Sequence, residues 1–220
     1  MVFAHGFGCD QHMWRYVAPR FEDEFRVVLF DHVGAGNSDL SAYDPQRYAS
    51  LSGYAEDVVA ICTGLELRDV IFVGHSVSAM IGVLAAAAAP ELFAKLVLVG
   101  PSPCYLNDAD YVGGFSVEDI NDMLESLESN YLGWSSVMAP VIMGRPDRPQ
   151  LGQELTESFC RTDPAIARQF ARVTFFPTIV RIYRLWRRRR WSCSASTTSS
   201  RPCRSVSSCV TGCRMRRWCC

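Results

Sequence analysis

A serine at the junction between an apolar run and an alanine-rich stretch is the feature that most constrains this chain. Ser76 lies within Val-Gly-His-Ser-Val-Ser (73–78), directly after the apolar run 70–73. The pattern is that of a strand, then a tight turn that carries the serine, then a helix. It predicts a nucleophile elbow, which exposes the serine Oγ above a sheet. The helix N-terminus would aim the backbone N–H of Val77 at a developing oxyanion. The alternative is a serine that only caps the helix. The second small residue of this motif is commonly Gly and is here Ser78.

Length and composition favour one domain. The chain has 220 residues, of which 49% are hydrophobic, and this is enough for one sizeable core. It contains no apolar run of about twenty residues, so no transmembrane helix is expected. The N-terminus lacks the basic and apolar regions of a signal peptide. We therefore expect a cytoplasmic protein that does not contact membranes.

Residues 1–176 alternate between short apolar runs and helical patterns, which predicts a doubly wound α/β sheet. The expected strands are short and rich in β-branched residues, as buried parallel strands are. They span Met1–Ala4, Arg26–Phe30, Val70–Val73 and Leu96–Val99, and the expected helices span about Ser50–Leu65 and Ser76–Ala89.

The segment 116–175 is helical only. Ser116 and Asp119 form a start that resembles a capping box, and one helical face continues from there through Tyr131. An all-helical insert after a strand predicts a cap over an active site, because aromatic residues in and before it could line a pocket: Tyr105, Phe115, Trp134 and Phe175. The alternative is a set of ordinary crossover helices. Further helices are expected to open at Pro149 and at Asp163-Pro164.

Two loops follow the first two expected strands. The loop His5-Gly6-Phe7-Gly8 predicts a second oxyanion donor, the backbone N–H of Phe7, because small flanking residues let the backbone approach a substrate carbonyl. The glycine-rich loop 31–38 has neither dinucleotide-binding nor Walker spacing and no lysine follows it. It therefore does not predict a nucleotide site.

Four segments together resemble one subfamily of the α/β-hydrolases. It is the subfamily of the bacterial stress-response regulator RsbQ and of the plant karrikin and strigolactone receptors. The resemblance covers about residues 1–176 and is carried by residues 5–11, 30–36, 74–78 and 100–108.

The resemblance implies an α/β-hydrolase fold, with an incomplete core at 1–103 and a helical cap at 104–176. It implies Ser76 as the nucleophile and the Phe7 and Val77 amides as the oxyanion hole. It also implies a small hydrophobic pocket and requires no cofactor and no metal. RsbQ-like members act on or sense a small hydrophobic ester or lactone-type ligand and pass a signal to a partner phosphatase. The residues expected to line the pocket are Phe7, Phe115, Trp134 and Phe175.

The chain departs from the family in its triad. A nucleophilic serine needs a histidine base and an orienting carboxylate, which follow the serine along the chain in this fold. No histidine follows Ser76, and no acidic residue follows Asp163. The triad Asp and His are therefore absent from this chain. Neither His75, which should point away from the serine Oγ, nor His5 is a convincing substitute.

The tail at 177–220 differs in composition from the rest of the chain. It holds 11 of the 22 basic residues, six of the ten cysteines and no acidic residue. One back-translation, read from its third base after Phe176, gives Asp-Asn-Arg-Ala-Asp-Leu-Pro-Ala-Val, which is similar to the family. We therefore expect an aberrant frameshift product, non-native or disordered, and neither a nucleic-acid-binding arm nor a zinc site.

These observations predict a protein truncated at the N-terminus that retains about four parallel strands. The strand at Leu96–Val99 would then be an exposed edge, which favours aggregation. Three functions stay open: an RsbQ-like serine hydrolase, a ligand-sensing regulator of a sigma-factor stress pathway with little catalysis, and a nonfunctional fragment.

Overall fold

The computed structural model describes residues 1–108, 111–176, 192–195 and 210–214, the last two segments by their backbone alone. At its centre is a sheet with the strand order β2-β1-β3-β4-β6-β5. The first four strands pair in parallel, which confirms the α/β fold and the four parallel strands expected from the sequence. They are β1 (Val2–Ala4), β2 (Val28–Leu29), β3 (Val70–His75) and β4 (Phe93–Val99).

The far side of β4 differs from the prediction. We expected β4 to be an exposed edge, but β6 (Val210–Arg214) pairs with it in antiparallel register from Lys95 to Val99. The short β5 (Ser192–Ala195) pairs antiparallel with β6. Ladder hydrogen bonds to β6 satisfy backbone groups that an edge strand would leave open. The expectation that the rest of the tail is non-native or disordered concerns 177–191, 196–209 and 215–220, which lie outside the described residues.

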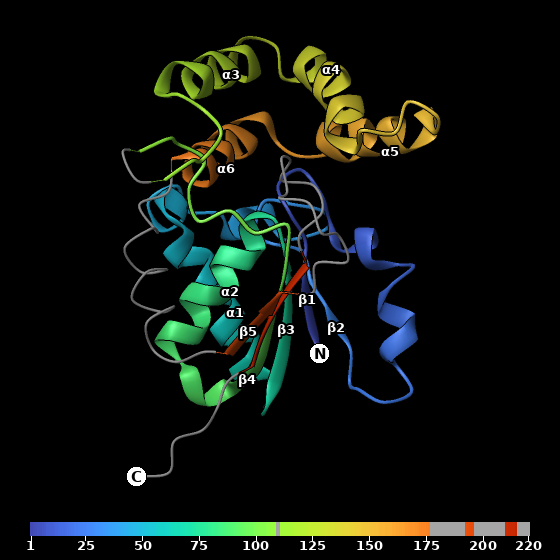
Figure 1. The fold of residues 1–220 in the computed structure, drawn as a ribbon, viewed down its shortest axis with the longest axis vertical. Helices are drawn as coiled ribbons and strands as arrows, with labels where there is room; N and C mark the ends of the chain where they lie inside the picture. The colour runs from blue at the N-terminus through green and yellow to red at the C-terminus, as the bar shows by residue number, and fades with distance from the viewer. Residues whose placement is uncertain (109–110, 177–191, 196–209, 215–220) are drawn as a thin grey trace.

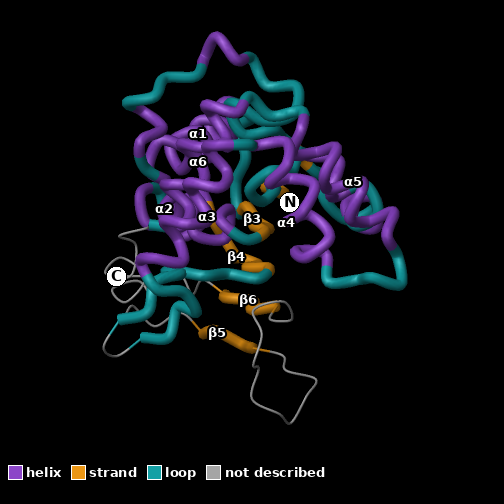
Figure 2. The backbone as a smooth tube through the Cα atoms, turned by 90° about the horizontal axis from the view of Figure 1, so that it is seen from above, coloured by secondary structure: helices purple, strands orange, loops and turns teal. Residues whose placement is uncertain are grey.

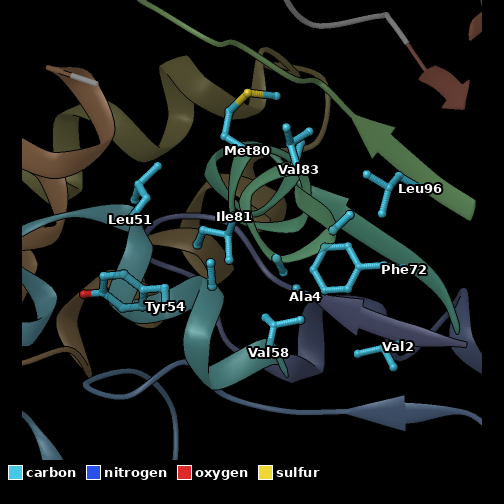
Figure 3. Packing of buried hydrophobic residues seen from close by; sticks show 14 of the residues in the cluster. Val2, Ala4, Leu51, Tyr54, Val58, Phe72, Met80, Ile81, Val83 and Leu96 are labelled. Atoms are coloured by element: carbon cyan, nitrogen blue, oxygen red, sulfur yellow. The ribbon is translucent and has the colours of Figure 1, made fainter. Parts of the chain in front are cut away.

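Helices α1 (Leu51–Gly64) and α2 (Val77–Ala88) pack together beside the parallel strands (Figure 1). Their apolar faces meet β1, β3 and β4 in the main core (Figure 3). Gly82 of α2 lies flat against β3, since a Cβ there would come within 2.4 Å of the Phe72 ring. Ordinary side chains at this position would push the helix off the sheet.

Four helices gather above one end of the sheet (Figures 1 and 2). The predicted capping box at Ser116 and Asp119 is present. The single helical face expected through Tyr131 is wrong, because Asn130 adopts a non-helical backbone (φ −152°, ψ 81°) and its side chain caps the next helix at the N–H of Gly133. The helices are α3 (Val117–Ser129), α4 (Tyr131–Met143), α5 (Pro149–Cys160) and α6 (Pro164–Phe175), and none of the described helices is long and apolar enough to cross a membrane.

Short 3₁₀ turns carry the connections between these elements. Two of them replace a full crossover helix between β1 and β2, and two more precede α1. Their bounds are η1 (Gln11–Trp14), η2 (Ala18–Phe21), η3 (Leu40–Ala42), η4 (Arg47–Ala49) and η5 (Pro90–Leu92).

Two histidines lie inside the core at the upper end of the sheet. His5 follows β1 and His32 follows the β2 strand, and they are 1% and 2% exposed. Burial lowers the pKa of His5, with smaller opposing effects from the Gly6 carbonyl and nearby acidic groups. Burial also lowers the pKa of His32 well below its usual value, and the neighbouring His5 lowers it further. Both rings are therefore neutral in the folded protein near neutral pH.

A matched pair of isoleucines tests the core. Ile81 is fully buried on α2 and Ile142 is 53% exposed on α4. We expect Ile81→Ala to lower the free energy of unfolding by about 2–5 kcal/mol, because it leaves a cavity. Ile142→Ala should change it by less than about 0.5 kcal/mol. Urea denaturation measures both, and equal losses would contradict the assignment of the core.

The buried histidines predict a dependence of stability on pH. Because the folded-state pKa values of His5 and His32 are lowered, the unfolded chain binds more protons below its own histidine pKa of about 6.5. The free energy of unfolding should therefore be steady above that pH and fall as the pH drops from about 6.5 toward 5. Urea unfolding across this range measures the slope, which His32→Gln should reduce. A flat profile in the parent chain would be inconsistent with neutral buried rings.

Candidate functional site

Ser76 occupies a strained turn between β3 and α2. Its backbone has φ 55° and ψ −121°, a left-handed conformation that a residue with a Cβ adopts at a cost of about 1–3 kcal/mol. Its N–H donates to the Val99 carbonyl at 2.8 Å, which ties the turn to the end of β4. Its side chain makes no capping hydrogen bond to α2. This geometry is that of a nucleophile elbow and does not fit a serine that only caps a helix.

Two glycines make room for the turn. A Cβ at Gly74 would come within 2.4 Å of the Ser78 carbonyl oxygen. A Cβ at Gly6 would come within 2.6 Å of the His75 Nδ1 and 3.2 Å of the Ser76 Cβ. The loop after β1 therefore lies directly against the Ser76 turn.

The two predicted oxyanion donors lie on the segments that meet here. Val77 is the first residue of α2, so its N–H has no partner within the helix. Phe7 follows Gly6 in the loop that contacts Ser76. Their roles as oxyanion donors stay predictions.

Helix α5 holds the same loop from above. The Ser158 hydroxyl donates to the Gly8 carbonyl at 2.8 Å, and Arg161 pairs with Asp10 at 2.9 Å. Burial alone would raise the pKa of Asp10, but hydrogen bonds from the His12 backbone and Arg161 keep that pKa below its usual value. Gly8 has φ 70°, and a Cβ there would overlap the ring of α5 residue Phe159, which lies 1.7 Å from that position. The loop is thus fixed by contacts that leave no space for a side chain.

The predicted pocket residues are only partly brought together. The Phe7 ring contacts Trp134 at 6.3 Å and Phe175 at 6.1 Å between centroids. Phe115 is 42% exposed and meets the Tyr105 ring at 6.5 Å, away from Phe7. Sequence reasoning missed two rings that also contact Phe7: Phe159 on α5 and Phe170 on α6, which lie on the buried faces of helices that it predicted.

An enclosed cavity of about 10 Å³ lies next to the Phe7 ring, between the loop after β2 and α6. It has room for about one water molecule. His32 and Phe170 are among its lining residues, and Ser76 is not. The ligand pocket beside Ser76 therefore stays a prediction.

Tyr105, one of the aromatic residues expected from the sequence to line a pocket, is a neighbour of Ser76. It follows β4, and its ring stacks edge-on against Phe175 at 5.1 Å. Burial raises the pKa of the Tyr105 phenol, and a hydrogen bond with Ser76 opposes part of that rise. The phenol is therefore neutral at neutral pH and does not act as a base toward Ser76.

The histidines near the elbow have other contacts. The His75 ring lies edge-on to Trp14 at 6.5 Å, and its Nδ1 has no hydrogen-bond partner among the described residues. Burial lowers the pKa of His75, and His5 lowers it further. In the part of the chain that the structure describes, no hydrogen bond joins Ser76 to a histidine. Within the same residues, no group of three or more His, Cys, Asp or Glu side chains is placed to hold a metal ion.

Comparisons with known proteins place this arrangement among characterised relatives. Karrikin insensitive 2 receptor CA of Petunia hybrida is 45% identical over 175 residues, which cover 80% of this chain and 65% of that protein. Strigolactone esterase RMS3 of Pisum sativum is 39% identical over 176 residues, covering 80% of this chain and 66% of that protein. This chain therefore spans less than two thirds of the length of these relatives.

A solved structure of a hydrolase from Oleispira antarctica superimposes with a TM-score of 0.80 at 43% identity, covering 82% of this chain and 67% of that one. Residues 1–201 match the sequence family described as the alpha/beta hydrolase fold. With the strained serine turn between β3 and α2, these findings show that the chain belongs to the α/β-hydrolase family, among relatives of the karrikin and strigolactone receptors.

Proposed function

We propose that Ser76 is the nucleophile of a serine hydrolase that acts on, or senses, a small hydrophobic ester or lactone-type ligand. The observation that carries this proposal is the strained backbone of Ser76, combined with a side chain that does not cap α2. Such strain persists where the surrounding structure enforces it, and it is concentrated at functional sites. The contacts of Gly6 and Gly74 supply that enforcement.

The proposed assignments follow from this nucleophile. The amides of Phe7 and Val77 stabilise the oxyanion, and the rings of Phe7, Trp134 and Phe175 bound the ligand, with Phe115 farther out. Residues 1–103 form the hydrolase core and 104–176 the cap. Cytoplasmic location and a role for a partner phosphatase stay predictions. The relatives that support the proposal are a karrikin insensitive 2 receptor and a strigolactone esterase.

The proposed chemistry is acyl transfer. The Ser76 Oγ bonds to the carbonyl carbon of the ester, the bond from that carbon to the alkoxy oxygen breaks, and the Ser76 proton passes to the leaving group. Water then hydrolyses the acyl-enzyme. Because this chain has no histidine after Ser76, attack lacks the usual base and should be slow, while the oxyanion donors and bound geometry still provide part of the catalysis.

A second candidate is a ligand sensor with little catalysis, as in an RsbQ-like stress regulator. The lack of a histidine after Ser76 favours it, because a serine without a base gives up its proton slowly. The frameshift hypothesis for 177–220 bears on both candidates, and sequencing the source DNA across the Phe176 codon tests it.

A fluorophosphonate probe tests the nucleophile. We expect slow labelling of one site in the 220-residue chain, located at Ser76 by peptide mass spectrometry and abolished by Ser76→Ala. The exposed Ser136 on α4 supplies the control, since Ser136→Ala should label at the parent rate.

Labelling that survives Ser76→Ala would refute the assignment of the nucleophile. A chain that is not labelled but gains thermal stability from a small hydrophobic lactone would favour the sensor.

A further inference from the structure

One buried hydroxyl connects the two backbone segments that meet at the elbow. Ser78, which stands where this motif commonly has glycine, is fully buried. Its Oγ lies 2.5 Å from the His5 carbonyl oxygen and 2.7 Å from the His32 Nε2. Ser78 is in the first turn of α2, His5 follows β1, and His32 follows β2. The hydroxyl therefore links three elements at a single point.

The donor and acceptor roles in this network can be assigned from its connectivity. The single proton of the Ser78 hydroxyl is donated to the His5 carbonyl, so the Ser78 oxygen accepts from the Nε2–H of His32. The His32 backbone N–H donates to the His5 Nε2 at 3.0 Å. His5 must then carry its proton on Nδ1, which donates to the Gly6 carbonyl at 2.9 Å. Each contact fixes the next, and both rings are neutral.

The network adjoins both predicted oxyanion donors. Ser78 directly follows Val77, and His5 is two residues before Phe7. The His5 and His32 rings pack edge-on with their centroids 4.7 Å apart, so the two segments are also in direct side-chain contact. Displacing either segment would also break a hydrogen bond in an environment closed to water, where an unpaired polar group is costly.

We propose that Ser78, His5 and His32 are positioning residues that fix the spacing between the Phe7 and Val77 amides. The inference rests on the proposed function, because it concerns how the oxyanion site is held and not which group attacks. It explains why serine suits position 78. The serine hydroxyl joins the loops after β1 and β2 by hydrogen bonds, whereas glycine would leave these loops in contact by packing alone.

The test compares two fully buried serines. Ser78→Ala removes the hydrogen bonds that join the two loops. Ser135→Ala removes an equally buried hydroxyl that donates to the Tyr131 carbonyl within α4. With the fluorophosphonate probe, we expect Ser78→Ala to lower the maximal labelling rate of Ser76 by about 10- to 100-fold with little change in the half-saturating probe concentration. Ser135→Ala should leave both values near those of the parent chain.

A substitution pair at His32 covers the case in which Ser78→Ala does not fold. His32→Gln retains an N–H donor near the position of Nε2, and His32→Met has a similar length without a donor. We expect labelling to be retained within a few-fold in His32→Gln and to be lost in His32→Met. Equal labelling in the two folded variants would overturn the proposal.

Hydrogen exchange separates this proposal from the function on which it rests. Ser78→Ala should accelerate exchange of the Cys9 and Ser76 amides, which donate to Gly6 and Val99 in the two joined segments, whereas Ser135→Ala should not. If the parent chain is not labelled but this exchange pattern is seen, the proposed function fails and the positioning network stands. If Ser78→Ala and Ser135→Ala exchange alike in both segments, the network is refuted whether or not Ser76 is labelled.

Discussion

The close approach of backbone to backbone at the Ser76 turn is the constraint on which the rest of the structure depends. The turn holds Ser76, a residue with a side chain, at φ 55°, and this is stable because β3, α2 and the loop after β1 converge without side chains between them. Gly6 and Gly74 provide that convergence. The parallel order of β1, β3 and β4 brings the carboxyl ends of these strands to one edge of the sheet, where the site forms.

Local patterns predicted most of the fold. The run 70–73 extends into β3, and the capping box at Ser116 starts α3, because both signals act over a few residues. The break at Asn130 escaped prediction, since the apolar spacing continues past it while a single side chain starts a new helix. The pairing of β6 with β4 joins segments more than a hundred residues apart, and no local pattern reports such a contact.

The candidate site was likewise predictable where local sequence encodes it and unpredictable where distant segments meet. The motif identified Ser76 and its loop, because strand, turn and helix are encoded side by side. Phe159 and Phe170 were not identified as site residues, since their approach to Phe7 depends on how helices α5 and α6 fold back over the sheet. The buried link through Ser78 depends on three elements at once. The only sign of this link in the sequence was Ser78 itself, which stands where the motif commonly has glycine.

The Phe7 ring packs against both major hydrophobic clusters, the one within the sheet layer and the one among α3 to α6. A side chain shared by two bodies moves when either of them moves. Any shift of α3 to α6 relative to the sheet must therefore be accommodated at the Phe7 ring, and through it by the loop that contacts the Ser76 turn. One phenylalanine thus couples the packing of the two layers.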